Sequence, residues 1–315
     1  MKLYNRKQIE DVVTLDEQAL EAVEAGFRAL GQGNVVQPPI LSMAIEESNG
    51  EVDVKTAHIK GNDHFAIKVS PGFFDNPKLG LPSLNGLMIV FSAKTGLVEA
   101  VLHDEGYLTD IRTALAGAIA AKYLANPGPS RVTVLGAGVQ AELQVAALML
   151  VREIDTLSVW ARDHAQAEAY ATKMAEKYDL IVNVSDDIGT ACEYADIIIT
   201  TTPSRQPLLD AIHLPEGVHI TAMGSDSPDK RELDSSVLER ANVFVADTRA
   251  QSESNGELKA YAGKEPPFVI YELGNVITSD RSPRTSPDQI TVCDLTGTGV
   301  QDTAIAGFAL SRLEK

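Results

Sequence analysis

The first periodic pattern in the chain predicts an amphipathic helix. Apolar residues repeat at helical spacing, at Leu20, Val23, Phe27 and Leu30. Thr14 and Glu17 have the spacing of a capping box, and Gly31 is a typical stop signal. We therefore expect a helix that ends at Gly31 and packs one face on a sheet.

Strand-like patterns follow between Glu51 and His103. The runs are VDVKTAHI, FAIKVS, GLMIVFS and GLVEAVLH, and turn residues 93–96 separate the last two. They predict a largely antiparallel sheet. An Ala-rich stretch from Tyr107 to Leu124 then predicts one long helix, and the turn-forming segment NPGPS at 126–130 marks a domain boundary.

Beyond that boundary, short apolar runs alternate with helix-like segments. The runs are VTVL (132–135), LSVW (157–160), IVNV (181–184), DIIITT (196–201), VHITAM (218–223), NVFVA (242–246) and QITVCDL (289–295). This alternation predicts an α/β fold with a doubly wound, Rossmann-type parallel sheet. An apolar helix from Asp302 to Leu313 is expected to return to the first lobe. The predicted domains are residues 1–125 with 303–315, a smaller α+β domain, and residues 126–302.

The run VTVLGAGVQA at 132–141 indicates a dinucleotide site. A buried strand is followed by Gly136, Gly138 and Ala141 in G-x-G-x-x-A spacing. Gly136 allows the tight turn, Gly138 admits a pyrophosphate close to the backbone, and Ala141 keeps the helix near the sheet. A Gly-rich turn that binds nothing is the alternative for the motif taken alone.

The end of the next strand bears on the choice of cofactor. An acidic residue at its tip favours NAD, whereas arginine favours the 2′-phosphate of NADP. Here the tip reads Ala161, Arg162, Asp163. The sequence thus favours NADP(H), with NAD(H) possible because of Asp163. Thr200, Thr201 and Thr202 close a later strand at the ligand-binding edge, although a plain turn explains them equally well.

Composition narrows the class of partner. The 315 residues include 27 Lys and Arg against 44 Asp and Glu, for a formal net charge of −17. Such acidity argues against nucleic acid or an anionic membrane and favours a small-molecule partner. No stretch approaches the roughly 18 apolar residues of a membrane span, and the N-terminus lacks the apolar core of a signal peptide, so we expect a cytoplasmic protein.

Two cysteines, Cys192 and Cys293, lack the spacing of a zinc site. No metal is implied, and buried thiols are the simpler interpretation. Lys68 is more unusual, because it interrupts an otherwise apolar strand and its ammonium must reach a cavity or an anion. A surface lysine is the alternative.

Four separated blocks together resemble the ornithine cyclodeaminase/mu-crystallin family over essentially the whole chain. They are FAIKVSPGFFDNPKLGLPSLNGLMIVFSAKTGLVEAVL, GYLTDIRTALAGAIAAKYLA, GAGVQA and AMGSDSPDKRELD. The wording SPGFFDNPKLGLPSLNG looks most like the branch associated with ectoine utilisation. The resemblance implies an NAD(P)-dependent enzyme acting on the carbon–nitrogen bond of a small amino acid or its imine. It also implies that the first domain binds substrate and forms a homodimer.

The same resemblance implies roles for individual residues. Lys68 matches an active-site lysine that contacts the substrate carboxylate, and Arg112, in LTDIRT, matches an arginine that reaches cofactor phosphate and substrate. Asp226, at the end of a parallel strand, matches the catalytic acid/base. An ordinary surface arginine and a turn-forming aspartate are the respective alternatives. Further positions implied at the cofactor are Ser83, Val139, Gln140, Ala222, Met223 and Lys230, and Thr296 is implied beside the substrate.

One departure from the family pattern concerns the substrate carboxylate. Cyclodeaminases use a second arginine upstream of the lysine, but no arginine lies between Arg28 and Arg112. Lys55 is our hypothesis for its replacement. The departure favours an imine reductase or amino-acid dehydrogenase, plausible in ectoine or hydroxyectoine breakdown, over an ornithine-type cyclodeaminase. A crystallin-like binder with little turnover is the third interpretation.

Overall fold

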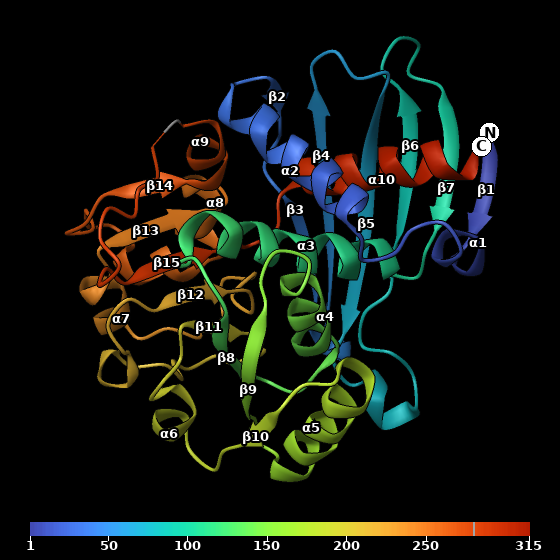
Figure 1. Cartoon of the computed structure of the whole chain (residues 1–315). Coiled ribbons are helices and arrows are strands. Elements are labelled where there is room, and N and C mark those ends of the chain that lie inside the picture. Colours follow the sequence, from blue (N-terminus) through green and yellow to red (C-terminus); the bar gives the residue numbers. More distant parts are fainter. Residues whose placement is uncertain (280) are drawn as a thin grey trace. The chain divides into compact units, whose positions relative to one another are not determined.

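The computed structural model describes residues 1–279 and 281–315 (Figure 1). Its internal contacts divide the chain into two compact units, Met1–Arg112 with Thr298–Lys315, and Thr113–Gly297. Residues 113–125 thus join the second unit, because Ala121 and Ala125 pack with Val132 of the parallel sheet. The division differs in these residues, and in 298–302, from the boundaries expected from the sequence.

The first unit is built on a mixed sheet with strand order β1-β7-β6-β5-β4-β2, in which β3 also pairs with β4. Every pair is antiparallel except β1 with β7, which confirms the largely antiparallel expectation. The strands are β1 (Lys2–Asn5), β2 (Val35–Val36), β3 (Leu41–Ile45), β4 (Gly50–Ile59), β5 (His64–Phe73), β6 (Leu87–Ser92) and β7 (Val98–His103).

Helix α10 (Gly299–Leu313) covers one face of this sheet (Figure 1). Thr303 fixes it there, because its hydroxyl donates to the Ala57 carbonyl at 2.7 Å and accepts from the Ala66 amide at 3.1 Å. The C-terminal helix therefore returns to the first unit, as expected. Since strand residues alternate between faces, Lys68 shares the α10 side with Ala66, whereas Phe65 and Ile67 lie on the opposite face.

Helix α2 (Glu17–Gly31) rests mainly on α10 rather than directly on the sheet. Gly26 permits this approach, because a Cβ there would lie 3.2 Å from the Ala304 Cβ. The expected capping box of Thr14 and Glu17 is wrong. Asp16 is the N-cap, and its carboxylate accepts from the Ala19 amide at 2.8 Å, while the Thr14 hydroxyl donates to Asp16 instead.

The second unit contains a parallel sheet of strand order β10-β9-β8-β11-β12-β15-β13-β14 (Figure 1). All neighbouring pairs are parallel, so the doubly wound prediction is confirmed. The order reverses between β8 and β11, where such sheets bind ligands. The strands are β8 (Ser130–Leu135), β9 (Ile154–Trp160), β10 (Val182–Val184), β11 (Ile197–Thr200), β12 (His219–Ala222), β13 (Val243–Ala246), β14 (Ile270–Glu272) and β15 (Thr291–Asp294).

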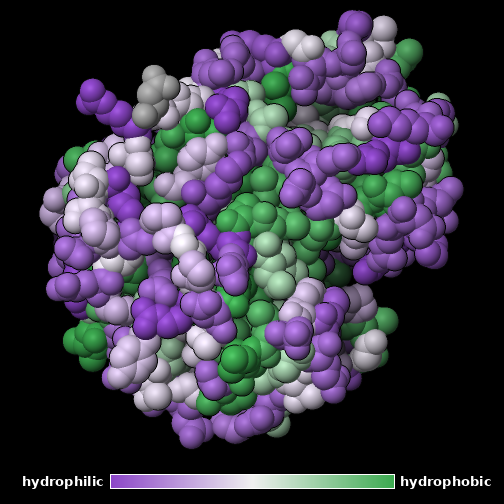
Figure 2. All heavy atoms as spheres, in the orientation of Figure 1, coloured by the Kyte–Doolittle hydropathy of each residue, from purple (hydrophilic) through white to green (hydrophobic). Residues whose placement is uncertain are grey.

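Helices flank both sheets and complete two separate cores. The remaining helices are α1 (Arg6–Glu10), α3 (Tyr107–Leu124), α4 (Val139–Leu148), α5 (His164–Tyr178), α6 (Ile188–Cys192), α7 (Ser235–Arg240), α8 (Arg249–Ser254) and α9 (Leu273–Thr278). Short 3-10 turns are η1 (Glu46–Ser48), η2 (Asn76–Leu79), η3 (Ala211–His213) and η4 (Glu257–Tyr261). Within the described residues, no helix has the length and apolarity needed to cross a membrane. Figure 2 shows hydrophilic residues over much of the visible surface, with apolar patches among them.

Candidate active site

The first unit buries three charged side chains in one cluster. The Lys68 ammonium, on β5, lies 3.2 Å from Asp302 Oδ2, and Arg112 Nε, on α3, lies 3.0 Å from Asp302 Oδ1. Lys68 is 2% exposed and Asp302 is fully buried. One carboxylate on α10 therefore joins a strand and a helix that are far apart in the sequence.

A second lysine adds to the positive charge of this cluster. Lys55 on β4 stands directly opposite Lys68 on β5, and the pairing puts both side chains on the α10 side. Lys55 is buried too, with its Nζ 3.9 Å from Asp53 Oδ2. Burial, and next the Arg112 charge, lowers the pKa of Lys68 to about 7 although Asp302 counteracts them. The cluster thus brings three buried basic side chains near the Asp302 carboxylate, and Asp53 supplies a second carboxylate beside Lys55.

Two further buried groups border the cluster. Gln301 accepts a 2.8 Å hydrogen bond from Arg112 Nη1 through Oε1, and its Nε2 has no acceptor among the described residues. Asp104 accepts from the Leu108 amide at 2.8 Å, and burial raises its pKa to about 6. Buried basic side chains beside an unused amide donor are suited to an incoming carboxylate. Sequence reasoning found Lys55, Lys68 and Arg112 but missed Gln301 and Asp302.

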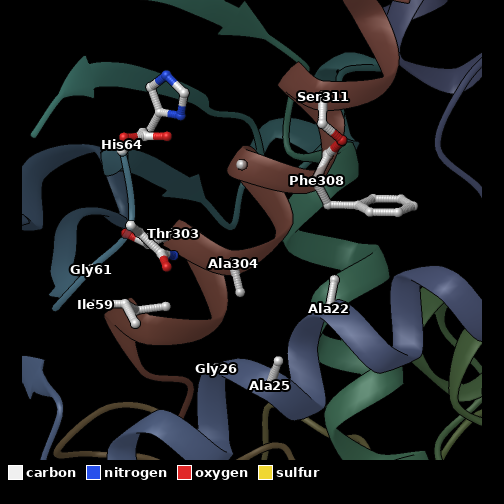
Figure 3. Close-up of a pocket in the computed structure, with 13 residues that line it drawn as sticks. Ala22, Ala25, Gly26, Ile59, Gly61, His64, Thr303, Ala304, Phe308 and Ser311 are labelled. Atoms are coloured by element: carbon white, nitrogen blue, oxygen red, sulfur yellow. The ribbon is translucent and has the colours of Figure 1, made fainter.

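A cavity in the first unit is separate from this cluster. It has a volume of about 500 Å³ and lies between α2, α10 and the turn after β4, where small side chains such as Ala22, Ala25 and Ala304 line it (Figure 3). Thr303 is its buried polar residue, and the backbone of β4 and β5 already satisfies that hydroxyl. The cavity is a gap between packed helices, and none of the charged residues of the cluster lines it.

The glycine motif of the second unit has the geometry that a pyrophosphate requires. Gly136 has φ +125°, and a Cβ there would lie 2.5 Å from Thr201 Oγ1. Gly138 is the N-cap of α4, with open space around its Cβ position and no side-chain cap. The first turn of α4 thus begins at open space without a side-chain cap, as an anion site at a helix N-terminus requires, and buried Ala141 packs the helix on the sheet. These residues fit a dinucleotide.

The three residues that follow β9, Ala161, Arg162 and Asp163, differ in exposure and in hydrogen bonding. Asp163 is the N-cap of α5, and its carboxylate accepts from the Ala165 amide at 3.0 Å. Ala161 is half-buried and Arg162 is exposed. The acidic group that would favour NAD is therefore used in capping the helix.

A buried glutamate joins the ends of β11 and β12. Glu232 accepts hydrogen bonds from the Thr202 amide at 2.6 Å, the Thr202 hydroxyl at 2.7 Å and the Gly224 amide at 2.8 Å. Burial raises its pKa. It fixes the positions of Thr202 and, through Gly224, of the adjoining Ala222 and Met223. The sequence pattern gave no sign of this role, because Glu232 lies in a charged stretch, KRELD.

The remaining candidates lie in the loops that follow the strands. Asp226 is 46% exposed and accepts a 2.8 Å hydrogen bond from Lys230 Nζ. Thr296 is buried, and its hydroxyl donates to the Asp247 carboxylate at 3.0 Å. Ser83 is half-buried in the segment after η2, where its carbonyl accepts from the Phe73 amide. Their proposed roles beside ligands stay predictions.

The amino-acid sequence matches the model of the ornithine cyclodeaminase/mu-crystallin family over residues 2–315. A putative dehydrogenase of Rhizobium meliloti is 51% identical over 317 residues, which cover 99% of this chain and 95% of that protein. An uncharacterised cyclodeaminase of Sinorhizobium fredii is 49% identical over 321 residues, which cover 100% and 96%.

Solved structures are similar over the whole chain. Thermococcus litoralis Delta(1)-pyrroline-2-carboxylate reductase, in complex with NADH and L-proline, has a TM-score of 0.91 at 27% identity, covering 99% of this chain and 97% of its own. The iminosuccinate reductase of Paracoccus denitrificans, with NAD+, has a TM-score of 0.90 at 29% identity and coverages of 100% and 96%. An archaeal alanine dehydrogenase dimer with bound NAD has a TM-score of 0.90 at 30% identity, covering 99% of this chain and 95% of its own.

Replacing Asp302 by asparagine tests the charge balance of the cluster. Asp302→Asn leaves Lys68 and Arg112 without their carboxylate, so we expect a loss of about 3–5 kcal/mol in the free energy of unfolding, measured with urea at pH 7. The loss should shrink at pH 9, because Lys68, with its pKa of about 7, then carries no charge. Asp63→Asn, which removes the carboxylate of the exposed pair with Lys94, is the control and should lose much less. Equal losses in the two variants would contradict this account.

Proposed function

The chain belongs to the ornithine cyclodeaminase/mu-crystallin family, and we propose that it is an NAD(P)-dependent oxidoreductase that interconverts a small α-amino acid and its imine. The observation that carries the proposal is the buried cluster in which Lys68 and Arg112 share the single carboxylate of Asp302, an arrangement that suits a second carboxylate from a substrate. Relatives of this chain include enzymes named alanine dehydrogenase, pyrroline-carboxylate reductase and iminosuccinate reductase.

We assign the substrate carboxylate to Lys68 and Arg112, with Gln301 Nε2 as an additional donor. An anion there would restore the proton on Lys68, since its depressed pKa comes from burial and neighbouring cations. Lys55 extends the positive surface on the same side of the sheet.

Lys55→Ala should raise the substrate KM without changing cofactor affinity, and an unchanged KM would exclude Lys55 from substrate binding.

We assign acid/base work to Asp226. Its carboxylate is partly exposed and accepts a hydrogen bond from Lys230, an arrangement that keeps an anion accessible to a proton at nitrogen or water. The bound nicotinamide would supply the acceptor or donor of a hydride. The Gly136 turn and the first turn of α4 would bind its pyrophosphate, with Thr202 held nearby by Glu232.

The alternative of an ornithine-type cyclodeaminase rests on family members of that kind. The absence of an arginine between Arg28 and Arg112 favours the reductase, because the paired guanidinium clamp for the carboxylate is missing. A crystallin-like binder is less favoured, because such a protein needs no acid/base beside its cofactor. The resemblance of residues 70–86 to the ectoine-utilisation branch supports an imine derived from diaminobutyrate as one substrate to test.

The open face of the first sheet supports a homodimer. Its alternate positions carry apolar residues that α10 does not cover, including Phe65, Ile67 and Ile89, and the rings of Phe65 and Phe91 stack with centroids 5.2 Å apart. We propose that a second copy covers this face. Sedimentation equilibrium would give twice the chain mass, whereas a single-chain mass would contradict the proposal. The cytoplasmic location expected from the sequence stays a prediction.

Asp226→Asn tests the reaction most directly. Asparagine keeps the shape and removes the base, so we expect turnover to fall by about 10²–10⁴-fold with unchanged cofactor affinity. NAD(P)H absorbance and ammonia should be followed together with imines, keto acids plus amines, and diaminobutyrate. Asp229→Asn, in the same loop and paired to Arg205 at 3.0 Å, should keep its activity. Full turnover by Asp226→Asn would refute the mechanism, and ammonia release without net NAD(P)H change would indicate the cyclodeaminase.

Arg162→Ala tests the preference for NADP(H), which we propose because Asp163 is engaged as the cap of α5. An exposed arginine at a 2′-phosphate is worth about 1.4 kcal/mol, so kcat/KM with NADPH should fall about tenfold. Activity with NADH serves as the internal control and should stay constant. An equal change with both cofactors would place Arg162 away from the phosphate.

A further inference from the structure

Lys259 has unusual surroundings for a lysine. It lies in η4, and its ammonium is within hydrogen-bonding distance of four oxygen atoms, none of which belongs to a carboxylate. They are Ser225 Oγ at 2.9 Å, the Ser227 carbonyl at 2.9 Å, the Asn255 carbonyl at 3.0 Å and the Lys230 carbonyl. Lys259 is half-buried, and burial lowers its pKa.

This set of ligands is typical of a bound monovalent cation. An ammonium has three N–H donors, so it cannot satisfy four oxygens one to one and instead attracts them as a central charge. The carboxylates of Asp226, Asp229, Glu257 and Asp294 add favourable electrostatic attraction from the elements around it. The Lys259 ammonium thus occupies the centre of a cage of four neutral oxygen atoms, where a bound metal cation could otherwise lie.

The cage is formed largely by the segment that carries Asp226. Ser225, Ser227 and Lys230 all belong to this segment, residues 225–230, and Asn255 comes from the C-cap of α8. The hydroxyl of Ser225 also donates to the Lys230 carbonyl at 2.8 Å, which draws the two ends of the segment together around the ammonium. Asp226 is therefore flanked in the chain by Ser225 and Ser227, two residues that Lys259 holds.

We propose that Lys259 is a positioning residue that acts as an internal cation and fixes the segment 225–230 so that Asp226 is held for proton transfer. The inference rests on the proposed role of Asp226. Loss of the ammonium would remove the one positive charge that the carbonyls of Ser227, Lys230 and Asn255 share, and the Ser225 hydroxyl and the Lys230 amide are weaker, neutral donors to them. The repulsion between these carbonyls would then loosen the segment. A small cation in solution could then replace the missing charge.

Two variants of the full-length enzyme test the inference. Lys259→Met removes the charge and keeps most of the stem, whereas Lys259→Ala leaves room for a solute. In both, kcat should fall by about 10- to 100-fold while cofactor affinity stays within about twofold. Ethylammonium chloride should restore most of the lost kcat in Lys259→Ala but not in Lys259→Met. Lys264→Ala, an exposed lysine nearby, is the control and should keep its activity.

Amide hydrogen exchange separates this inference from the proposed function. Residues 225–230 should exchange faster in Lys259→Ala, and ethylammonium should slow the exchange again, whatever reaction the enzyme catalyses. Unchanged kcat, or lost kcat that ethylammonium does not restore, would overturn the positioning role. If exchange and rescue behave as expected but Asp226→Asn retains turnover, Lys259 still fixes the segment and the proposed role of Asp226 fails.

Discussion

The first unit depends on one buried carboxylate, Asp302, placed between Lys68 and Arg112. Taking each of these ions out of water costs several kcal/mol, and the attraction between them repays that only when all are in place. Asp302 stands in the first turn of α10, which Gly299 allows to lie close to β4, because a Cβ there would be 2.3 Å from the Thr56 carbonyl oxygen. The close contact between α10 and β4 thus also places Asp302 beside Lys68 and Arg112, the residues to which we assign the substrate carboxylate. A core of apolar residues would be a simpler means of joining these elements, and the two buried basic side chains that share one carboxylate are what points to a ligand.

Buried charged side chains also organise the second unit. There they bind backbone amides and carbonyls, whereas in the first unit they pair with one another. Glu232 gathers amides and hydroxyls at the ends of β11 and β12, and Lys259 gathers carbonyls below the loop of Asp226. The Glu232 carboxylate binds backbone donors, and the Lys259 ammonium binds backbone acceptors. Together they fix the conformation of loops that contain little regular secondary structure. These loops lie at the carboxyl ends of the parallel strands, the edge where doubly wound sheets bind ligands.

The sequence predicts those features whose cause is local. Gly136 and Gly138 are required by backbone conformation and close approach, apolar runs mark the buried strands, and Lys68 is conspicuous because its neighbours along β5 are apolar. It does not reveal Asp302, Glu232 or Lys259, because each owes its role to partners distant along the chain. The sequence pattern misplaces the cap of α2, because Asp16, a stronger acceptor, stands between Thr14 and Glu17. Strands β1 and β2 are too short to show a period, and the Ala-rich α3 does not reveal which unit its ends join.

The proposed function depends on a substrate carboxylate that completes a cationic site in which Lys68, with its pKa of about 7, is only partly protonated near neutral pH. Calorimetric titration of the NADPH-bound enzyme with propionate, in buffers of different ionisation enthalpy, measures the protons taken up on binding. Propionate has no amine, so such protons come to the protein. The account predicts uptake of about one proton at pH 8, where Lys68 with its pKa of about 7 must be recharged, and little uptake at pH 6. Binding without proton uptake at either pH would contradict it.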